Sequence, residues 1–306
     1  MNEVQRHIPV MLSEVLDALN VIDGGVYVDA TFGFGGYSAA ILDKAKCKVI
    51  ALDRDPTVLS RAQEYKAKYH ERFEFHQTRF SCLQEFVKEK VDGVVFDIGV
   101  SSMQIDDAER GFSFLKTAKL DMRMSKEGIS AYDLVNTLDE NELADILYHF
   151  GEEKKSRQIA RKIALYRQEK PIETTTELAN IIYQVIYKKT GHPDPATRTF
   201  QALRIAVNDE LCELKQALEA SKNLLKPEGR LVVVDFHSLE DRIVKTFFKE
   251  NTVQKVHVSR YKKELPSDDK AFCFASDVIL PSKEETDFNP RAHSAKMRFA
   301  IKSKGE

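Results

Sequence analysis

The stretch "DATFGFGGYSAAIL", residues 29–42, decides how the first part of the chain folds. It begins at the end of an apolar run, "GVYVDA", that is typical of a buried strand, and it leads into "YSAAILDKA", which is typical of a helix. Glycines crowd the turn between them, and glycine permits a positive φ and the close approach of a ligand to the backbone. A strand, a glycine turn and a helix in this order predict the first unit of an α/β sheet.

The same alternation of strand and helix continues to residue 100. Pro56 is expected to open the second helix, since proline is favoured in a first helical turn. Short strands separated by helices are typical of a parallel, doubly wound sheet. Strand character returns near the end of the chain, where the last two strands are expected to finish one edge of the sheet. The expected strands are 25–30, 47–53, 72–77, 91–99, 229–238, 270–279 and 296–303.

The chain between about residues 109 and 200 has helical patterning and no convincing strand. Thr137 with Glu140, and Thr174 with Glu177, have the spacing of a capping box, in which two side chains satisfy N–H groups at a helix start. Residues 251–270 are expected to form an exposed connection. We therefore predict a discontinuous sheet domain, residues 1–108 and 204–306, with an inserted helical domain at 109–203.

The composition of the 306 residues is that of an ordinary globular protein, with 42% hydrophobic and 31% charged residues. The formal net charge of -2 gives no overall sign of nucleic-acid binding, so any such surface has to be local. The 4 cysteines are far apart, which argues against a zinc knuckle or a disulfide scaffold and suits a reducing cytosol. No signal peptide or membrane-spanning segment is expected.

The glycine turn reads Gly33-Phe34-Gly35-Gly36-Tyr37-Ser38. A strict dinucleotide motif needs glycine where Ser38 stands, and no GK[ST] follows, which excludes a P-loop. Asp53 ends the next strand at roughly the position from which an acid binds a ribose diol. An NAD site and a tight turn without a ligand both remain open at this point.

Asp29 favours a different ligand. It lies directly before the turn, where its carboxylate would repel a pyrophosphate and pair with the amino group of an amino-acid-like ligand. An acid at the end of each of the first two strands, with a glycine turn between, suggests S-adenosylmethionine. The hypothesis is that Gly33 and the rest of the turn approach its methionine part, while Asp53 accepts from its ribose hydroxyls.

Several long and unusual blocks of this sequence occur together in one known family. The chain closely resembles the bacterial small-subunit ribosomal RNA cytosine-N4 methyltransferases in these blocks, in order and over nearly its whole length. The blocks are "HIPVMLSEVL", "DATFGFGGYS", "GVSSMQID", "RGFSF", "LDMRM", "RTFQALRI", "FHSLEDR" and "NPRAHSAKMR".

The resemblance implies a Rossmann-like S-adenosylmethionine-dependent methyltransferase sheet that carries an inserted helical domain for substrate recognition. It also implies methyl transfer to N4 of a cytidine in the decoding region of 16S rRNA, in the cytoplasm, with a small ribosomal subunit or its late precursor as partner. Many members have histidine where this chain has Tyr37. The cofactor contacts that it implies fall on Gly35, Gly36, Tyr37, Asp53, Phe80, Asp97 and Gln104.

The chemistry requires hydrogen-bond acceptors at the reacting amine, because the N4 lone pair of cytosine is delocalised into the ring. Related amine methyltransferases use an Asp/Asn/Ser-Pro-Pro-aromatic turn, of which this chain keeps only Asp97. Ser101 is a further candidate acceptor, although capping of a turn explains it equally well. Asp235 and His237 are candidates for contacts with the base or its phosphate, and a structural role for His237 stays open.

The substrate base has to leave its stack to reach a methyl donor. Basic residues gather locally, and the arginines within the family blocks are the candidate phosphate ligands: Arg110, Arg198, Arg204 and Arg291. The basic residues between 154 and 167 are expected to form mostly a solvated helix face. Two alternatives remain, an NAD-dependent oxidoreductase that uses Asp53 and a non-catalytic RNA-binding protein. No metal is expected.

Overall fold

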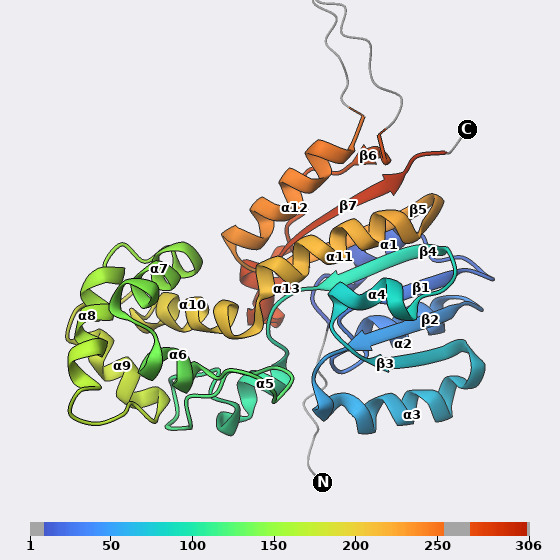
Figure 1. Cartoon of the computed structure of the whole chain (residues 1–306). Helices are drawn as coiled ribbons and strands as arrows, with labels where there is room; N and C mark the ends of the chain where they lie inside the picture. The colour runs from blue at the N-terminus through green and yellow to red at the C-terminus, as the bar shows by residue number, and fades with distance from the viewer. Residues whose placement is uncertain (1–8, 254–269, 305–306) are drawn as a thin grey trace, which may run out of the picture. The chain divides into compact units, whose positions relative to one another are not determined.

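The computed structural model describes residues 9–253 and 270–304 (Figure 1). The chain divides into two compact units. Residues up to Gly99 and from Leu211 onward form one, which we call the sheet unit, and Val100–Glu210 form the other, the helical unit. The expected connection at 251–270 lies almost entirely outside the described residues.

The sheet unit holds seven strands in the order β3-β2-β1-β4-β5-β7-β6. The first five strands along the chain are parallel, which confirms the predicted doubly wound sheet. The last two strands do finish one edge, but β7 runs antiparallel to both of its neighbours. The strands are β1 Val26–Asp29, β2 Lys48–Asp53, β3 Phe73–Gln77, β4 Val91–Asp97, β5 Leu225–Asp235, β6 Phe272–Ala275 and β7 Lys296–Lys302.

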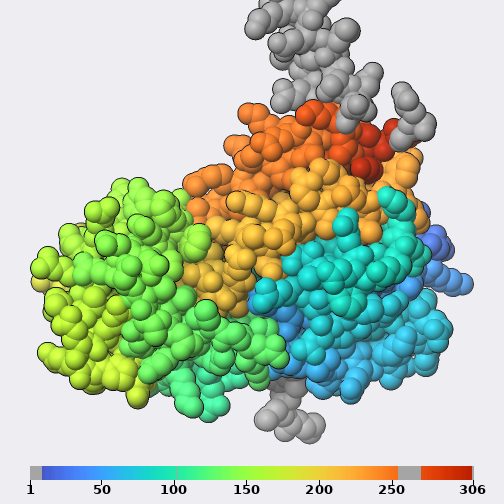
Figure 2. Space-filling model, in the orientation of Figure 1, coloured from blue at the N-terminus to red at the C-terminus, as the bar shows by residue number. Residues whose placement is uncertain are grey.

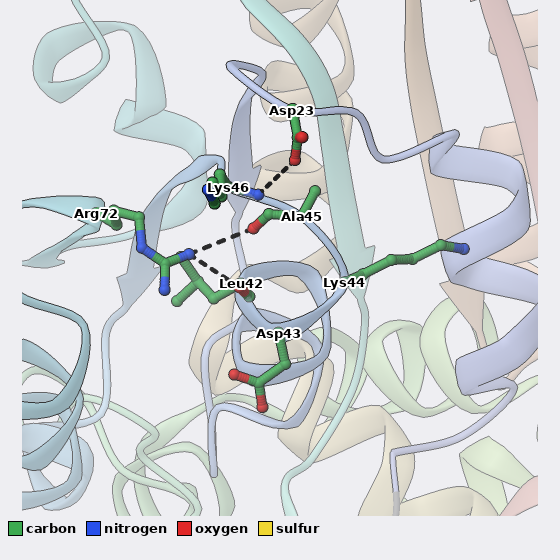
Figure 3. Close-up of a pocket in the computed structure, with 7 residues that line it drawn as sticks. All are labelled: Asp23, Leu42, Asp43, Lys44, Ala45, Lys46 and Arg72. Atoms are coloured by element: carbon green, nitrogen blue, oxygen red, sulfur yellow. Dashed lines mark hydrogen bonds between the residues drawn. The ribbon is translucent and has the colours of Figure 1, made fainter.

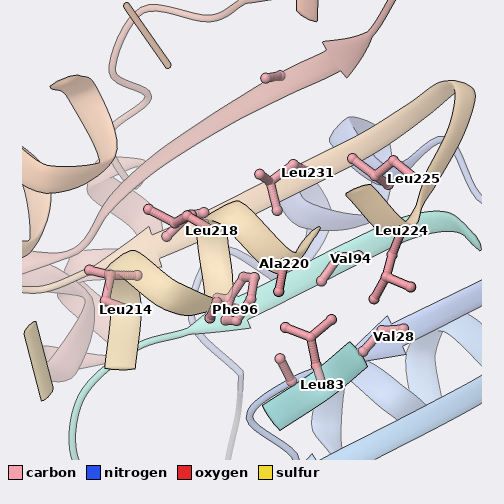
Figure 4. Close-up of a cluster of buried hydrophobic side chains, with 14 of the residues drawn as sticks. Val28, Leu83, Val94, Phe96, Leu214, Leu218, Ala220, Leu224, Leu225 and Leu231 are labelled. Carbon is pink, nitrogen blue, oxygen red and sulfur yellow. The ribbon is translucent and has the colours of Figure 1, made fainter. Parts of the chain in front are cut away.

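Helices of the sheet unit cover the strands with apolar side chains. Figure 4 shows Val94 and Phe96 of β4 and Leu231 of β5 in one cluster with Leu214 and Leu218. Burial of a parallel sheet by helices explains why its strands read as nearly continuous apolar runs. The helices are α1 Leu12–Leu19, α2 Gly36–Lys44, α3 Leu59–Tyr69, α4 Leu83–Phe86, α11 Glu210–Leu224, α12 Ser238–Asn251 and α13 Lys283–Phe288.

The helical unit has a core of its own, to which Leu143, Leu147, Ile159, Ile163 and Leu203 contribute. It contains no strand, as expected, and its surface is drawn in green to yellow in Figure 2. Its helices are α5 Ser102–Asp106, α6 Ala131–Thr137, α7 Glu140–Gly151, α8 Ser156–Tyr166, α9 Thr175–Tyr183 and α10 Ala196–Asn208. Within the described residues, no helix is both long and apolar enough to cross a bilayer.

Helix starts follow capping chemistry, with one correction. Thr174 caps α9 by accepting from the Glu177 N–H (3.2 Å), as predicted. The capping box predicted at Thr137 is wrong, because Thr137 is the last residue of α6 and donates to the Asp133 carbonyl. Asp139 caps α7 instead, since its carboxylate accepts from the first free N–H groups of that helix.

Candidate active site

Four neighbouring parallel strands of the sheet unit each end in an aspartate: Asp53 on β2, Asp29 on β1, Asp97 on β4 and Asp235 on β5. Because carboxyl ends of parallel strands meet at one edge, and ligands of open α/β sheets bind there, these residues define the candidate site. Asp29 and Asp235 are fully buried. The sequence singled out all four, but it did not predict that they form one row.

Burial is the largest cause of the raised pKa values of all four carboxyls, and only Asp235 has opposite charges nearby, those of Lys296 and Arg298, which lower its pKa in part. Burial raises the pKa of Asp29 and of Asp53 to about 6. Burial, followed by the charges of Asp29 and Glu240, raises the pKa of Asp97 to about 8. Burial, followed by the charges of Glu240 and Asp241, raises the pKa of Asp235 to about 8. A positively charged ligand at this edge would favour the ionised carboxylates.

The glycine turn lies between β1 and α2, and Asp53 holds it from the neighbouring strand. The Gly33 N–H donates to Asp53 Oδ2 at 2.8 Å, while the Asp55 N–H donates to Oδ1 at 2.9 Å. Gly35 has a φ of 80°, and a Cβ placed there would lie 2.6 Å from the Tyr65 ring. Only glycine fits at this position, so the backbone of the turn stays bare.

Asp29 is already bound to the chain. Its Oδ2 accepts from both the N–H and the Oγ–H of Ser38, at 3.1 and 2.7 Å, and its Oδ1 accepts from the Thr31 N–H at 3.3 Å. This explains why serine replaces the last glycine of a dinucleotide motif. Asp29 therefore fixes the first turn of α2, and a further contact with a ligand's amino group stays a prediction.

A segment that the sequence did not connect with the site packs on the glycine turn. The hydroxyl of buried Tyr37 donates to the Val10 carbonyl, and a Cβ at Gly36 would lie 2.1 Å from Pro9 Cγ. The Met11 N–H donates to Glu285 of α13. In the sequence, only the family block "HIPVM" marks this segment, and nothing in the block indicates that it packs on the glycine turn. Since the Tyr37 hydroxyl is engaged, a cofactor contact of this residue would come from its ring or backbone.

Two of the four aspartates have carboxylate oxygens without a partner in the described part of the chain. These are Asp97 Oδ1 and both oxygens of Asp235, and all three atoms are buried. Buried polar atoms are nearly always hydrogen-bonded, so orphaned acceptors at a strand edge indicate a ligand that donates or carries positive charge. The cationic sulfur and the amino group of S-adenosylmethionine fit this set of acceptors.

His237 is held at the start of α12 by Glu240. Glu240 Oε2 accepts from the N–H groups of Phe236 and His237, at 3.0 and 3.2 Å, and its Oε1 lies 3.0 Å from His237 Nε2. The His237 Nδ1 accepts from the Glu240 N–H at 3.4 Å. His237 and Glu240 form a capping box at the start of α12. Glu240 was missed in the sequence because capping boxes usually begin with Ser or Thr, although a glutamate three residues after His237 was a usable signal.

Two further predicted site residues, Ser101 and Gln104, form the capping box at the start of α5. A third, Phe80, lies just after β3. In the helical unit, Ser101 Oγ accepts from the Gln104 N–H at 3.3 Å, and Gln104 Oε1 accepts from the Ser101 N–H at 3.0 Å. The capping role weighed for Ser101 is therefore present. In the sheet unit, half-buried Phe80 follows β3 and meets the Phe96 ring edge-on, with centroids 5.8 Å apart.

The four candidate arginines differ in exposure. Arg198 and Arg291 are exposed. Arg110 is buried and donates to the carbonyls of residues 123 and 124, at 3.0 and 2.9 Å. Arg204 forms a two-pronged ion pair with Glu210, with both N–O distances 2.8 Å. Arg198 and Arg291 therefore suit phosphate better than the other two do.

A cavity of about 420 Å³ lies at the opposite end of the strands (Figure 3). Residues that precede β1, β2 and β3 line it, among them Asp23, Lys46 and Arg72. Arg72 donates there to the carbonyls of Leu42 and Ala45. None of the predicted site residues lines this cavity, and it faces away from the edge where open α/β sheets bind ligands.

Comparison with known proteins gives consistent matches over the chain. Residues 4–303 match the sequence model of the MraW methylase family. The "Ribosomal RNA small subunit methyltransferase H" of Rickettsia massiliae (strain Mtu5) is 52% identical over 301 residues, which cover 97% of this chain and 98% of that protein. Its namesake from Rickettsia bellii (strain OSU 85-389) is 50% identical over 302 residues, covering 97% and 99%.

Two solved structures also align with the chain. An rRNA methylase from Streptococcus thermophilus has a TM-score of 0.43 and 12% identity, covering 97% of this chain and 99% of that one. A SAM-dependent O-methyltransferase from Thermotoga maritima has a TM-score of 0.43 and 14% identity, covering 99% and 69%.

Proposed function

Because this chain belongs to the MraW methylase family, we propose that it transfers a methyl group from S-adenosylmethionine to N4 of a cytidine in the decoding region of 16S rRNA. The family, the Rossmann-like methyltransferase fold and S-adenosylmethionine as cofactor agree with the sequence-based predictions. The alternative of an NAD-dependent oxidoreductase is not supported, since the matches are to methylases. The names of the similar Rickettsia proteins support ribosomal RNA as the substrate.

The observation that carries the proposal is the row of four aspartates at the carboxyl edge of the sheet, in which Asp97 and Asp235 have buried oxygens without a partner in the described residues. S-adenosylmethionine supplies a methyl group on a positively charged sulfur, which is a good leaving group. Asp53, already positioned by Gly33, would bind the ribose, and the bare backbone at Gly35 and Gly36 would bind the methionine part. Asp97 lies on the strand beside Asp29 and would face the reacting group.

Asp97 is the proposed acceptor for a hydrogen of the N4 amine. Its carboxylate would localise the nitrogen lone pair and take up the positive charge that develops there. In the free protein burial keeps this group largely protonated at neutral pH, with a pKa of about 8. A positively charged neighbour would ionise it and so prepare the acceptor. Asp235 and His237 are proposed to hold the base or its phosphate, with Ser101 as a further candidate.

We further propose that the inserted helical domain, residues 109–203, recognises the RNA. Exposed Arg198 of this domain suits a phosphate contact, and exposed Arg291 of the sheet unit suits another. Arg110 and Arg204, which bind their own chain, would act by shaping the unit. A small ribosomal subunit or its late precursor in the cytoplasm is the proposed setting.

The direct test uses small subunits and 16S rRNA from cells that lack the protein, incubated with purified enzyme and labelled S-adenosylmethionine. Mass mapping of the rRNA should find one N4-methylcytidine in the decoding region, and the Asp97→Asn variant should give far less of it. Label in another base or in another RNA would refute the proposed substrate.

A further inference from the structure

Two close contacts join segments of the helical unit near the start of α8. Lys155 Nζ donates to the Val185 carbonyl at 3.1 Å, which joins α8 to the segment that follows α9. A Cβ at Gly151 would lie 2.5 Å from the Arg198 carbonyl, so the end of α7 packs closely on the start of α10. We call the surface made by residues 154–161 and 185–189 the basic tip.

Four cations of the basic tip have no partner in the part of the chain that the structure describes. The side chains of Lys154, Arg157, Arg161 and Lys189 are exposed. Among the residues that the structure describes, they make no hydrogen bond or ion pair. Four positive charges thus point to solvent from adjoining segments, in a chain with a net charge of -2.

Two of the nearby acids, Glu153 and Asp194, do not neutralise these charges. Glu153 is buried, and its Oε1 accepts from the Lys155 N–H at 2.8 Å. Asp194 binds Lys188, with 2.7 Å between Nζ and Oδ2. Arg157 and Arg161 are four residues apart on one helix, where like charges destabilise the helix. Within the described residues, no acidic side chain pairs with Arg157 or Arg161 to offset this repulsion. We take the uncompensated repulsion as an indication of an anionic partner.

An aromatic side chain accompanies the charges. Tyr187 is 81% exposed and directly precedes Lys188 and Lys189. Exposed aromatic rings among cations are the combination that single-stranded nucleic acid uses, because phosphates pair with the cations and bases stack on the rings. An acidic protein surface would also accept a tyrosine, but rRNA, the proposed substrate, offers both phosphates and unpaired bases.

We propose that the basic tip is an RNA-binding surface that contacts rRNA phosphates through Lys154, Arg157, Arg161 and Lys189 and stacks an unpaired base on Tyr187. This inference rests on the proposed RNA substrate and replaces the expectation of a mainly solvated helix face. The tip contributes to binding of the substrate and not to methyl transfer itself.

The test compares two variants that remove the same charge. The first changes Lys154, Arg157, Arg161 and Lys189 to Gln. The control changes Lys88, Lys215, Lys245 and Lys249 to Gln; these are exposed lysines of the sheet unit, also without a partner in the described chain. Circular dichroism and thermal melts establish that both variants fold.

The tip variant should raise KM for the rRNA substrate about tenfold or more, with kcat nearly unchanged. Each lost phosphate contact should also reduce the slope of log affinity against log salt by about 0.7–0.9, so the slope should fall by about 3 in all. The control should keep most of the wild-type KM and slope. Tyr187→Ala should weaken binding, whereas Tyr187→Phe, which keeps the ring, should not.

Two outcomes separate this inference from the proposed function. If the wild type methylates rRNA but the tip variant keeps its KM and salt slope, or the control changes as much as the tip variant, the inference is overturned and the function stands. If the wild type transfers no methyl group to rRNA, the proposed function fails and the inference fails with it.

Discussion

Asp97 combines two properties that rarely coexist in a merely structural residue. Its Oδ1 is buried without a partner in the described chain, and its backbone N–H is fixed by the Thr31 hydroxyl at 2.7 Å. A group held in place with an unused acceptor is suited to a reacting ligand. Asp97→Asn keeps the shape and removes the charge, so kcat should fall by about 10²–10³-fold, and the affinity for S-adenosylmethionine, whose positive charge Asp97 is also proposed to face, should fall by less. Single-turnover methylation measures the loss in rate, and calorimetry measures cofactor affinity. A variant with wild-type kcat would show that Asp97 takes no part in methyl transfer.

The raised pKa values of Asp97 and Asp235 predict how the stability of the ligand-free protein depends on pH. An unfolded aspartate has a pKa near 3.9, whereas both folded groups have a pKa of about 8. Between these values the folded state holds protons that the unfolded state has released, so rising pH favours unfolding. The stability that the two bound protons give the folded state is fully present below about pH 4. It falls as the pH rises and is lost once the pH has passed through about 8.

Thermal melts from pH 6 to pH 9 test this expectation. The wild type should lose several degrees of Tm more than the Asp97→Asn/Asp235→Asn variant over this range, because the amides do not titrate. Parallel curves for the two proteins would mean that these carboxyls are not the groups that titrate.

At the scale of an element, the glycine turn between β1 and α2 requires space as well as a positive φ. Gly35 and Gly24 have similar φ values, 80° and 74°, so alanine is strained at both. A Cβ at Gly35 would lie 2.6 Å from Tyr65, whereas at Gly24 it would have nothing within 4 Å. Gly24→Ala therefore controls for backbone strain alone.

Gly35→Ala should cost about 1–3 kcal/mol more in the free energy of unfolding than Gly24→Ala, which is the usual cost of overpacking. It should also weaken S-adenosylmethionine binding, while the control binds normally. Denaturant titration and calorimetry measure the two effects. Equal losses in both variants would show that the turn has room for a side chain.

The same turn shows what the sequence does and does not determine. Its strand, its helix and the placement of Asp29 and Asp53 at strand ends could all be predicted, because they follow from local hydrophobic patterning. The bonds from Ser38 to Asp29 could not, since only the folded turn brings the two side chains together. Capping shows the same limit: Thr137 has the right spacing, but Asp139 has the stronger acceptor and forms the cap.

At the scale of the whole molecule, the helical unit has its own buried core, and Val100–Glu210 is one continuous segment. A segment with its own core can in principle fold alone. Expressed by itself, this segment should show helical circular dichroism and a cooperative thermal transition. A broad, non-cooperative melt would show that it depends on the rest of the chain.

Longer-range features were harder to predict. The parallel direction of the first five strands follows from their alternation with helices, but their order does not, and nothing in the final two strands indicates that β7 inserts antiparallel between β5 and β6. Similarly, the packing of Pro9 and Val10 on the glycine turn joins segments more than twenty residues apart and leaves no local pattern. Glu240 escaped prediction because its capping partner is an unusual one, His237.

We propose that the methyl donor binds at the row of four aspartates. A crystal structure of the protein with S-adenosylhomocysteine is the most direct test of this proposal. The ribose hydroxyls should lie within hydrogen-bonding distance of Asp53, the methionine part should lie on the backbone of Gly33–Gly36, and the sulfur should face the ends of β1 and β4. A ligand bound elsewhere, for example in the cavity beside Arg72, or one that leaves Asp53 and Asp97 without contact, would contradict the account.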